Sequence, residues 1–282
     1  MKDTATIILA LIVALNFHGV APAHDFWIEP SSYRLEPNSL VQIALRVGER
    51  FDRGEPVVRN ASRIERFVVI GPGGEQPVIG KDGADPAGVI RPEQPGLYTV
   101  VYRNVPSRIE LEAEKFEAYL REEGLDAIIT SRRDRGESAK PGKEQYSRCA
   151  KSLLWAGSGP AKGFQKPVGL PLELVPDKNP YKLGSGEELP VRLLLDGKPV
   201  QDALIVAVPR GAPDRKLSAR TGTDGRASFK LEPGGAWLIN CVHMARAPAG
   251  AEVDWISLWA SLSFERGDRP RPIAVAPAAS SP

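Results

Sequence analysis

Glycine and proline interrupt this chain so often that long helices are excluded over most of its length. The 282 residues include 27 glycines and 26 prolines, spread along the whole sequence. Glycine admits left-handed turns and proline removes a backbone donor, so both tend to end regular elements. Between them lie short runs rich in β-branched and aromatic residues, such as 40–47, 66–70 and 97–102. These runs predict a mainly β protein of sandwich type.

The runs fall into two blocks, joined by the glycine- and proline-containing segment 157–160. We expect an N-terminal β-sandwich over residues 24–160 and a second sandwich over 161–265. The predicted fold class is therefore two tandem immunoglobulin-like β-sandwiches. Residues 266–282, rich in Pro, Ala, Arg and Ser, lack the apolar content of a core and are predicted to be a disordered tail.

One interval of the first block, at about 109–135, has helical rather than alternating periodicity. Leu111, Phe116 and Leu120 recur at spacings that place apolar side chains on one helical face. Gly124 is predicted to end a first helix, and 125–133 to form a second. The first sandwich is therefore expected to contain a helical insertion.

The first 23 residues have the organisation of a secretory signal peptide. Lys2 precedes an apolar run at 7–15, and Ala21-Pro22-Ala23 follows as an A-x-A cleavage site. An apolar run of about nine residues is too short to span a bilayer, which takes about 20. Cleavage after Ala23 is favoured, because cleavage after Ala21 would leave proline first. We expect an exported protein with His24 at its mature amino terminus and no membrane insertion after cleavage.

Charge and cysteine content limit the partners and the crosslinks. The formal net charge is +2 and no basic stripe carries interleaved aromatics, so nucleic acid is not an expected partner. The two cysteines, Cys149 and Cys241, would be permitted to form one disulfide in an oxidising compartment. Two buried free thiols remain the alternative.

Several stretches carry a resemblance to known families. They are 23–30, 115–125, 146–148, 236–244 and 254–262. With them the chain resembles, over about 24–265, the bacterial family called domain of unknown function 4198, which is grouped with nickel-uptake periplasmic proteins. The segment from Asp196 to Trp237 also looks like the prealbumin-like, carboxypeptidase regulatory-like module. The resemblance implies a periplasmic location, a two-sandwich build with a prealbumin-like C-terminal half, and a role near transition-metal uptake.

The mature chain would hold two histidines, His24 and His243, and these are the candidate metal ligands. An N-terminal histidine chelates through its free amine and its ring nitrogen, and a second imidazole would complete a brace of three nitrogens. Such donors favour copper, then nickel or zinc. Asp25, Glu29 or Asp254 could add an oxygen. In the alternative interpretation, His24 is only the residue left by the peptidase and His243 a satisfied strand histidine.

The leading functional hypothesis is a periplasmic binding or accessory protein, not an enzyme, that captures nickel, cobalt or copper for a membrane uptake component. A structural or adhesive module that binds protein or glycan is the first alternative, and a histidine-brace copper enzyme is the second. No catalytic residue is assigned, because the sequence has no G-x-S-x-G motif and His243 has no evident partner in sequence.

Overall fold

The computed structural model describes residues 25–49, 51–159 and 162–267. The predicted signal peptide, His24, the expected boundary between residues 160 and 161, and most of the predicted tail lie outside these ranges. Within them the protein is mainly β, as the turn-rich sequence predicts.

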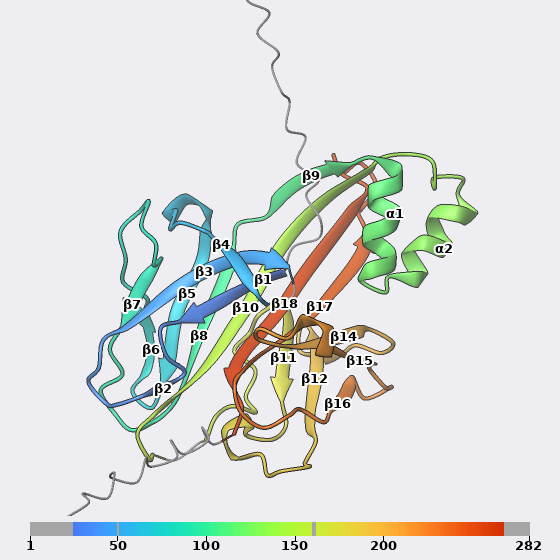
Figure 1. The fold of residues 1–282 in the computed structure, drawn as a ribbon. Helices are drawn as coiled ribbons and strands as arrows, with labels where there is room; N and C mark the ends of the chain where they lie inside the picture. The colour runs from blue at the N-terminus through green and yellow to red at the C-terminus, as the bar shows by residue number, and fades with distance from the viewer. Residues whose placement is uncertain (1–24, 50, 160–161, 268–282) are drawn as a thin grey trace, which may run out of the picture.

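A ten-stranded sheet runs through the whole molecule (Figure 1). Along its main path the strands are β15 (Leu217–Arg220), β14 (Leu204–Pro209), β17 (Ala236–Arg246), β18 (Trp255–Glu265), β10 (Gly142–Ala156), β8 (Gly96–Asn104), β5 (Ile64–Gly71) and β6 (Gly74–Pro77). Two further strands, β2 (Arg34–Leu35) and β9 (Ser107–Leu111), also pair with β10. The two halves of the chain meet in the middle of this sheet, where β10 and β18 pair in parallel.

Two smaller sheets cover opposite faces of the long sheet. One contains β1 (Asp25–Pro30), β3 (Val41–Glu49), β4 (Arg53–Pro56) and β7 (Gly88–Ile90). The other contains β11 (Leu172–Pro176), β12 (Leu189–Leu195), β13 (Lys198–Pro199) and β16 (Arg226–Phe229).

The central strand β10 shows how the two cores are separated. Side chains alternate between the faces of a strand. Ala150 and Leu154 accordingly lie in the core beneath the β1 sheet, whereas Cys149 and Leu153 lie in the core beneath the β11 sheet. The predicted sandwiches are present, and they share this central sheet as one common layer.

The helical insertion is a hairpin of α1 (Ala113–Glu122) and α2 (Asp126–Asp134). It begins four residues later than the predicted start at residue 109, because Ser107–Leu111 pair with β10. Gly124 ends α1 as predicted. Its φ of 64° is left-handed, and the Leu125 amide donates to the Leu120 carbonyl at 2.8 Å, as in a Schellman motif.

The described residues also form three short 3₁₀ turns, at Ala61–Arg63, Pro180–Lys182 and Pro213–Arg215. Among the described residues, no helix combines the length and apolar character that crossing a bilayer requires.

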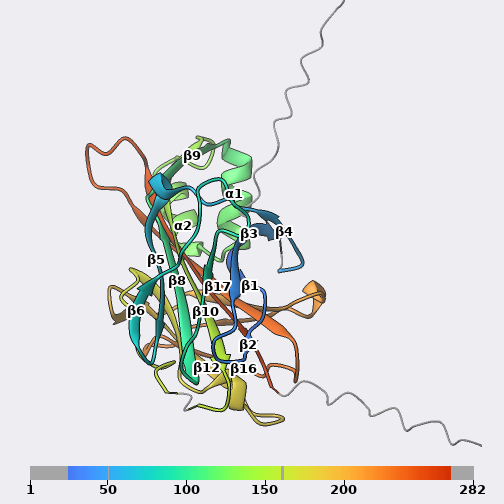
Figure 2. The ribbon, with the colours of Figure 1, turned by 90° about the vertical axis from the view of Figure 1, so that its left-hand side faces the viewer.

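The hairpin packs at one end of the long sheet, beside β9 (Figures 1 and 2). Phe116 and Leu120 of α1 form an apolar cluster with Met244 of β17 and Trp255 of β18. Phe26 of β1 belongs to the core that contains Ala150. The helices and the β1 sheet therefore cover neighbouring parts of the same face of the long sheet, and a seam lies between them.

Cys149 and Cys241 are buried free thiols, which excludes the disulfide alternative. Both residues pair with Ala260, one from each neighbouring strand. Two strand spacings place their Cα atoms about 10 Å apart, beyond the roughly 4.4–6.8 Å that a bridge needs. Burial raises the pKa of the Cys149 thiol to about 11 and that of Cys241 still further.

Candidate functional site

His243 lies on the face of β17 that the β11 sheet covers. Its side chain follows Cys241 at a spacing of two, and Cys241 belongs to the core beneath that sheet. The histidine is partly buried, and this burial lowers the pKa of its imidazole. We therefore expect a neutral ring at neutral pH.

Asp25, which follows His24 in the sequence, contacts the other face of β17. Asp25 is the first residue of β1, and its carboxylate accepts a hydrogen bond of 2.5 Å from the Asn240 side chain. Asn240 and His243 are three residues apart in an uninterrupted pairing register, so their side chains lie on opposite faces. His24 itself is outside the described residues, and the predicted brace with His243 remains untested.

A small pocket lies at the seam where β1, α1 and the β17–β18 pair meet, and we call it the acidic pocket. It encloses about 260 Å³ of space, including open solvent. Its lining residues are Asp25, Phe26, Glu123, Asn240, Cys241, Val242, Trp259, Ala260 and Ser261. Asp25 belongs to β1 and Glu123 follows α1, so two carboxylates from distant parts of the chain meet here.

Ser261 gives the pocket an unused polar group. It pairs with Asn240 across β17 and β18, so the two side chains share a face. Ser261 is only 6% exposed, and its hydroxyl has no hydrogen-bond partner among the described residues. A buried hydroxyl without a partner costs about 1–3 kcal/mol. A polar or charged occupant of the pocket would remove that cost.

The electrostatics of the pocket favour a cation. Burial and, to a lesser degree, the neighbouring charges of Asp25, Glu122 and Glu144 together raise the pKa of the Glu123 carboxyl from 4.5 to about 8, with Lys216 opposing the rise. Glu123 is also the C-cap residue of α1, where the negative end of the helix dipole adds to the same potential. A bound cation would offset this excess of negative charge.

A polar network lies beside the pocket and fixes Trp259. Glu144, which is buried, accepts hydrogen bonds from the Ser257 hydroxyl and, at 3.2 Å, from the Tyr119 hydroxyl. The Trp259 indole donates to the Ser257 oxygen at 3.0 Å and stacks on the Tyr119 ring with centroids 5.5 Å apart. Burial raises the pKa of Glu144, and these hydrogen bonds oppose that rise.

The other predicted oxygen ligands are engaged elsewhere. Glu29 forms ion pairs with Arg46 and Arg210. Asp254 accepts a hydrogen bond from the Lys143 amide at 3.1 Å. Within the described part of the chain, no three His, Cys, Asp or Glu side chains are grouped closely enough to hold a metal ion. The acidic pocket alone therefore provides an incomplete ligand set.

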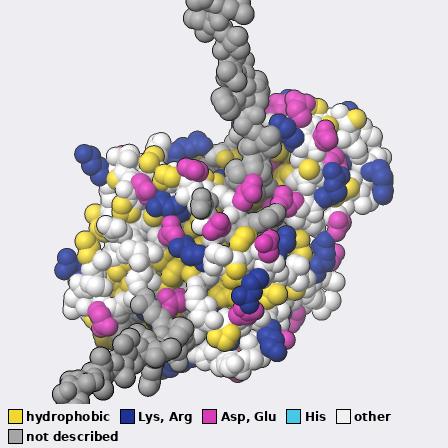
Figure 3. Space-filling view, in the orientation of Figure 1, with side chains coloured by type: hydrophobic (Ala, Val, Ile, Leu, Met, Phe, Trp, Pro, Cys, Tyr) yellow, Lys and Arg dark blue, Asp and Glu magenta, His cyan; other side chains and the backbone are white. Residues whose placement is uncertain are grey.

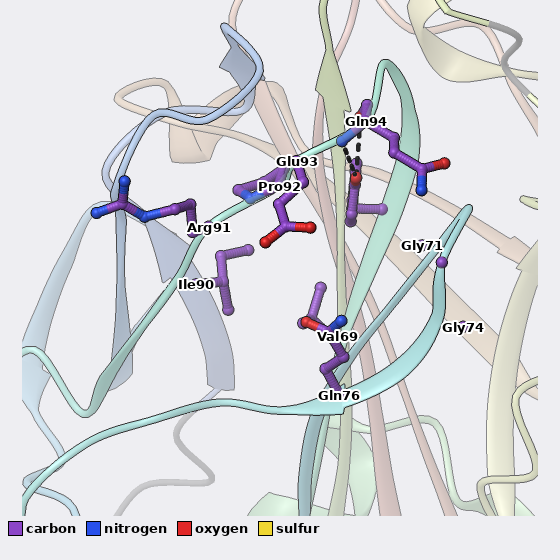
Figure 4. Close-up of a pocket in the computed structure, with 11 residues that line it drawn as sticks. Val69, Gly71, Gly74, Gln76, Ile90, Arg91, Pro92, Glu93 and Gln94 are labelled. Atoms are coloured by element: carbon purple, nitrogen blue, oxygen red, sulfur yellow. Dashed lines mark hydrogen bonds between the residues drawn. The ribbon is translucent and has the colours of Figure 1, made fainter.

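A second hollow, of about 390 Å³ including open solvent, lies beside the turn between β5 and β6 (Figure 4). Val69 and Ile90 supply apolar side chains to it. The Tyr98 hydroxyl is hydrogen-bonded to both the amide and the carbonyl of Gln94, at 3.1 and 2.9 Å. Its lining residues include none of the buried unpartnered polar side chains found in the described structure.

Figure 3 shows acidic and basic side chains interspersed over the face that it presents. This mixture agrees with the near balance of charges in the sequence.

Comparison with known proteins assigns the family. The model of the domain of unknown function DUF4198 matches residues 21–245, and the chain belongs to this family. The predicted association with nickel uptake and the prealbumin-like C-terminal module remain predictions. No curated protein is a significant match.

Two solved structures are among those that the chain matches. The D0–D1 domain of intimin is 11% identical, with 85% of this chain and 97% of that chain covered and a TM-score of 0.20. Dimeric latent PorU from Porphyromonas gingivalis is 13% identical, with 88% of this chain and 21% of that chain covered and a TM-score of 0.18. Scores this low carry no argument about fold or function.

The stretches that carry the family resemblance converge on the acidic pocket. Asp25 comes from the first, Glu123 from the helical one, and Trp259 and Ser261 from the last. Glu123 and Ser261 were not among the site residues predicted from the sequence. Their presence in the stretches that carry the family resemblance was the sequence signal that could have identified them.

Proposed function

We propose that this protein is an exported binding protein that captures a divalent transition-metal ion at its mature amino terminus and passes it to a membrane uptake component. The observation that supports the proposal is the pair of carboxylates, Asp25 and Glu123, that line the acidic pocket, because Asp25 is the residue that follows His24 in the sequence.

The chemistry fits a borderline metal ion such as nickel, cobalt or copper. The free α-amine has an ordinary pKa of about 7.7–8.0, so a metal displaces its proton near neutral pH. Amine and imidazole nitrogens suit these metals, and a carboxylate supplies an oxygen donor and a balancing charge. The proposal uses His24 without His243, because Asp25 contacts the face of β17 opposite to His243.

The decisive experiment compares two starting points of the metal-free chain by calorimetric titration with Ni²⁺ and Cu²⁺. One begins at His24 and the other at Ala21, which retains the native residues Ala21–Ala23. Pro22 has no backbone N–H, so the longer terminus cannot chelate through that amide. We expect one ion per chain for the His24 form and an affinity at least about tenfold lower for the longer form, a difference of about 1.4 kcal/mol.

A matched pair of variants tests the carboxylate. Glu123→Gln should weaken metal binding, whereas Glu122→Gln removes the same charge from an exposed neighbour and should change affinity little. Equal binding by the two starting points, or no binding by either, would overturn the proposal. The second result would favour the structural or adhesive alternative. Mass spectrometry of the exported protein tests the predicted start at His24.

A further inference from the structure

Arg148 of β10 is a partly buried cation held between two aromatic rings. Its guanidinium carbon lies 4.8 Å from the ring centroid of Phe26 and 5.6 Å from that of Tyr146. Its backbone amide donates to the Asn104 side chain at 2.5 Å, which fixes the point where the arginine side chain begins. Rings contact the faces of a guanidinium and leave its N–H edge open. The neighbours therefore hold Arg148 in place without using its side-chain donors.

The Arg148 guanidinium has no carboxylate or carbonyl acceptor in the described ranges. Other buried or half-buried arginines of the fold differ from it. Arg132 pairs with Glu117 at 2.7 Å, and Arg246 makes two bonds to Glu137. A charge withdrawn from water is costly unless it is paired. An anion from outside the chain would supply the missing partner of Arg148.

A second arginine without a carboxylate partner lies nearby. Arg63 donates through Nη2 to the Ser107 hydroxyl at 2.6 Å, and Ser107 pairs with Tyr146 across β9 and β10. Burial raises the pKa of Tyr102, and the charges of Arg148 and Arg63 both oppose that rise. No carboxylate is among the charges that act on Tyr102 or Arg148. We call this cluster the arginine site; its members are Phe26, Arg63, Tyr102, Tyr146 and Arg148.

The arginine site suits an organic acid. The edge of a guanidinium matches the two oxygens of a carboxylate, and such charge-assisted pairs are among the stronger hydrogen bonds. Burial lowers the pKa of Arg148, but an arginine stays protonated in proteins, so its positive charge persists. The half-buried ring of Tyr146 beside it offers apolar contact to a carbon skeleton, which inorganic anions lack. The additional charge of Arg63 favours a ligand with two carboxylates over a ligand with one.

We propose that the arginine site binds a small organic dicarboxylate, with one carboxylate on the guanidinium of Arg148 and the second drawn toward Arg63. This inference goes beyond metal capture, because it needs neither His24 nor a metal ion. Neither arginine lines the acidic pocket. The two proposals can therefore fail separately.

The test uses three small molecules of equal chain length and different charge. Succinate carries two carboxylates, butyrate carries one, and succinamide carries none. Each is titrated into the metal-free chain that begins at His24, and binding is followed by ¹⁵N–¹H NMR. We expect butyrate to bind about two- to fivefold more weakly than succinate, the range of an exposed ion pair. Succinamide should produce no saturable shift.

Two variants assign the roles of the arginines. Arg148→Gln should weaken succinate binding about 10- to 100-fold, the range expected when a charged hydrogen-bonded partner is lost. Arg63→Gln should reduce the affinity for succinate to that for butyrate. Arg121→Gln removes an equal charge from an exposed position on α1 and should change neither affinity. Should thermal unfolding show that Arg148→Gln is misfolded, Arg148→Lys keeps the charge without the two-pronged geometry and should give an intermediate loss.

Equal binding of succinate and succinamide would overturn the inference, as would unchanged succinate binding in Arg148→Gln. Inorganic phosphate that binds more tightly than succinate would overturn the assignment to an organic acid. No binding of succinate by the unaltered protein up to about 10 mM would also overturn the inference. It would leave metal capture intact, since Ni²⁺ binding is measured separately.

Discussion

The strongest stability prediction concerns an ion pair buried between the long sheet and the β11 sheet. The Lys151 ammonium lies 2.6 Å from Glu173, and the two side chains are 3% and 2% exposed. Glu173 also accepts hydrogen bonds from the amides of Val168, Gly169 and Leu170. One carboxylate therefore neutralises a buried cation and anchors the segment that leads into the second half of the chain.

The substitution Glu173→Gln removes the charge and keeps an oxygen for the backbone amides. It leaves the Lys151 ammonium buried without a counter-charge, a loss that costs about 3–5 kcal/mol in comparable pairs. Lys151→Met in the same chain removes that ammonium, so the double variant should recover about half of the loss. The free energy of unfolding should show this coupling.

The pH dependence of the stability loss in Glu173→Gln provides an independent test. Burial lowers the pKa of Lys151, and Glu173 opposes that effect. Without Glu173 we expect the folded-state pKa to fall further below the unfolded value of about 10.4. The unfolded chain then binds more protons between these two values, so stability rises with pH through that window. The deficit of Glu173→Gln should accordingly be larger at pH 6 than at pH 10.

Urea unfolding of the parent, Glu173→Gln, Lys151→Met and the double variant, each at pH 6 and pH 10, measures these effects. Glu252→Gln is the control, because Glu252 pairs with Arg108 on the surface, where the two side chains are 75% and 59% exposed. Exposed pairs contribute about 0–1 kcal/mol. A cost below about 1 kcal/mol for Glu173→Gln would refute the reasoning, as would single-variant costs that simply add in the double variant.

Two further predictions follow from burial. Cys149 and Cys241 should resist iodoacetamide in the native protein at pH 8 and both react after unfolding, as followed by intact mass; a native adduct on either thiol would contradict their placement. The raised pKa of Glu123 stabilises the metal-free fold below the unfolded value of 4.5 and is a cost as pH rises toward about 8. In thermal unfolding with a chelator present, the free energy of unfolding of Glu123→Gln should therefore equal that of the parent protein at pH 4 and exceed it at pH 9. The excess should be at most about 5 kcal/mol, at roughly 1.4 kcal/mol per pKa unit. Equal stability of the two proteins at pH 9 would contradict the cause assigned to the pKa shift.

Local features of the sequence predicted the fold class well. Glycine and proline spacing indicated short strands, and the helical spacing of Phe116 and Leu120 with Gly124 beyond them located α1. The start of the insertion was misplaced because Ile109 and Leu111 fit a helical pattern as well as a strand. Partner strands decide such cases, and β10 supplies the partner.

The candidate site was harder to predict because its parts are distant in sequence. Asp25, Glu123 and Ser261 meet only when β1, α1 and β18 are packed. Nor could the sequence show which face of β17 looks toward Asp25. Trp237, Leu238 and Ile239 are all buried, since this strand lies between two layers, and the alternation that would distinguish the faces is absent.

The central position of β18 has a consequence for the order in which the chain is made. This strand is the last in the described sequence, yet it fills the gap between β10 and β17. Until residues 255–265 have been synthesised, both of those neighbours carry an unpaired edge, which is a template for association with other chains. The sheet can close only after β18 has been synthesised. A chain stopped before residue 255 should consequently accumulate as an aggregate rather than as a smaller folded protein.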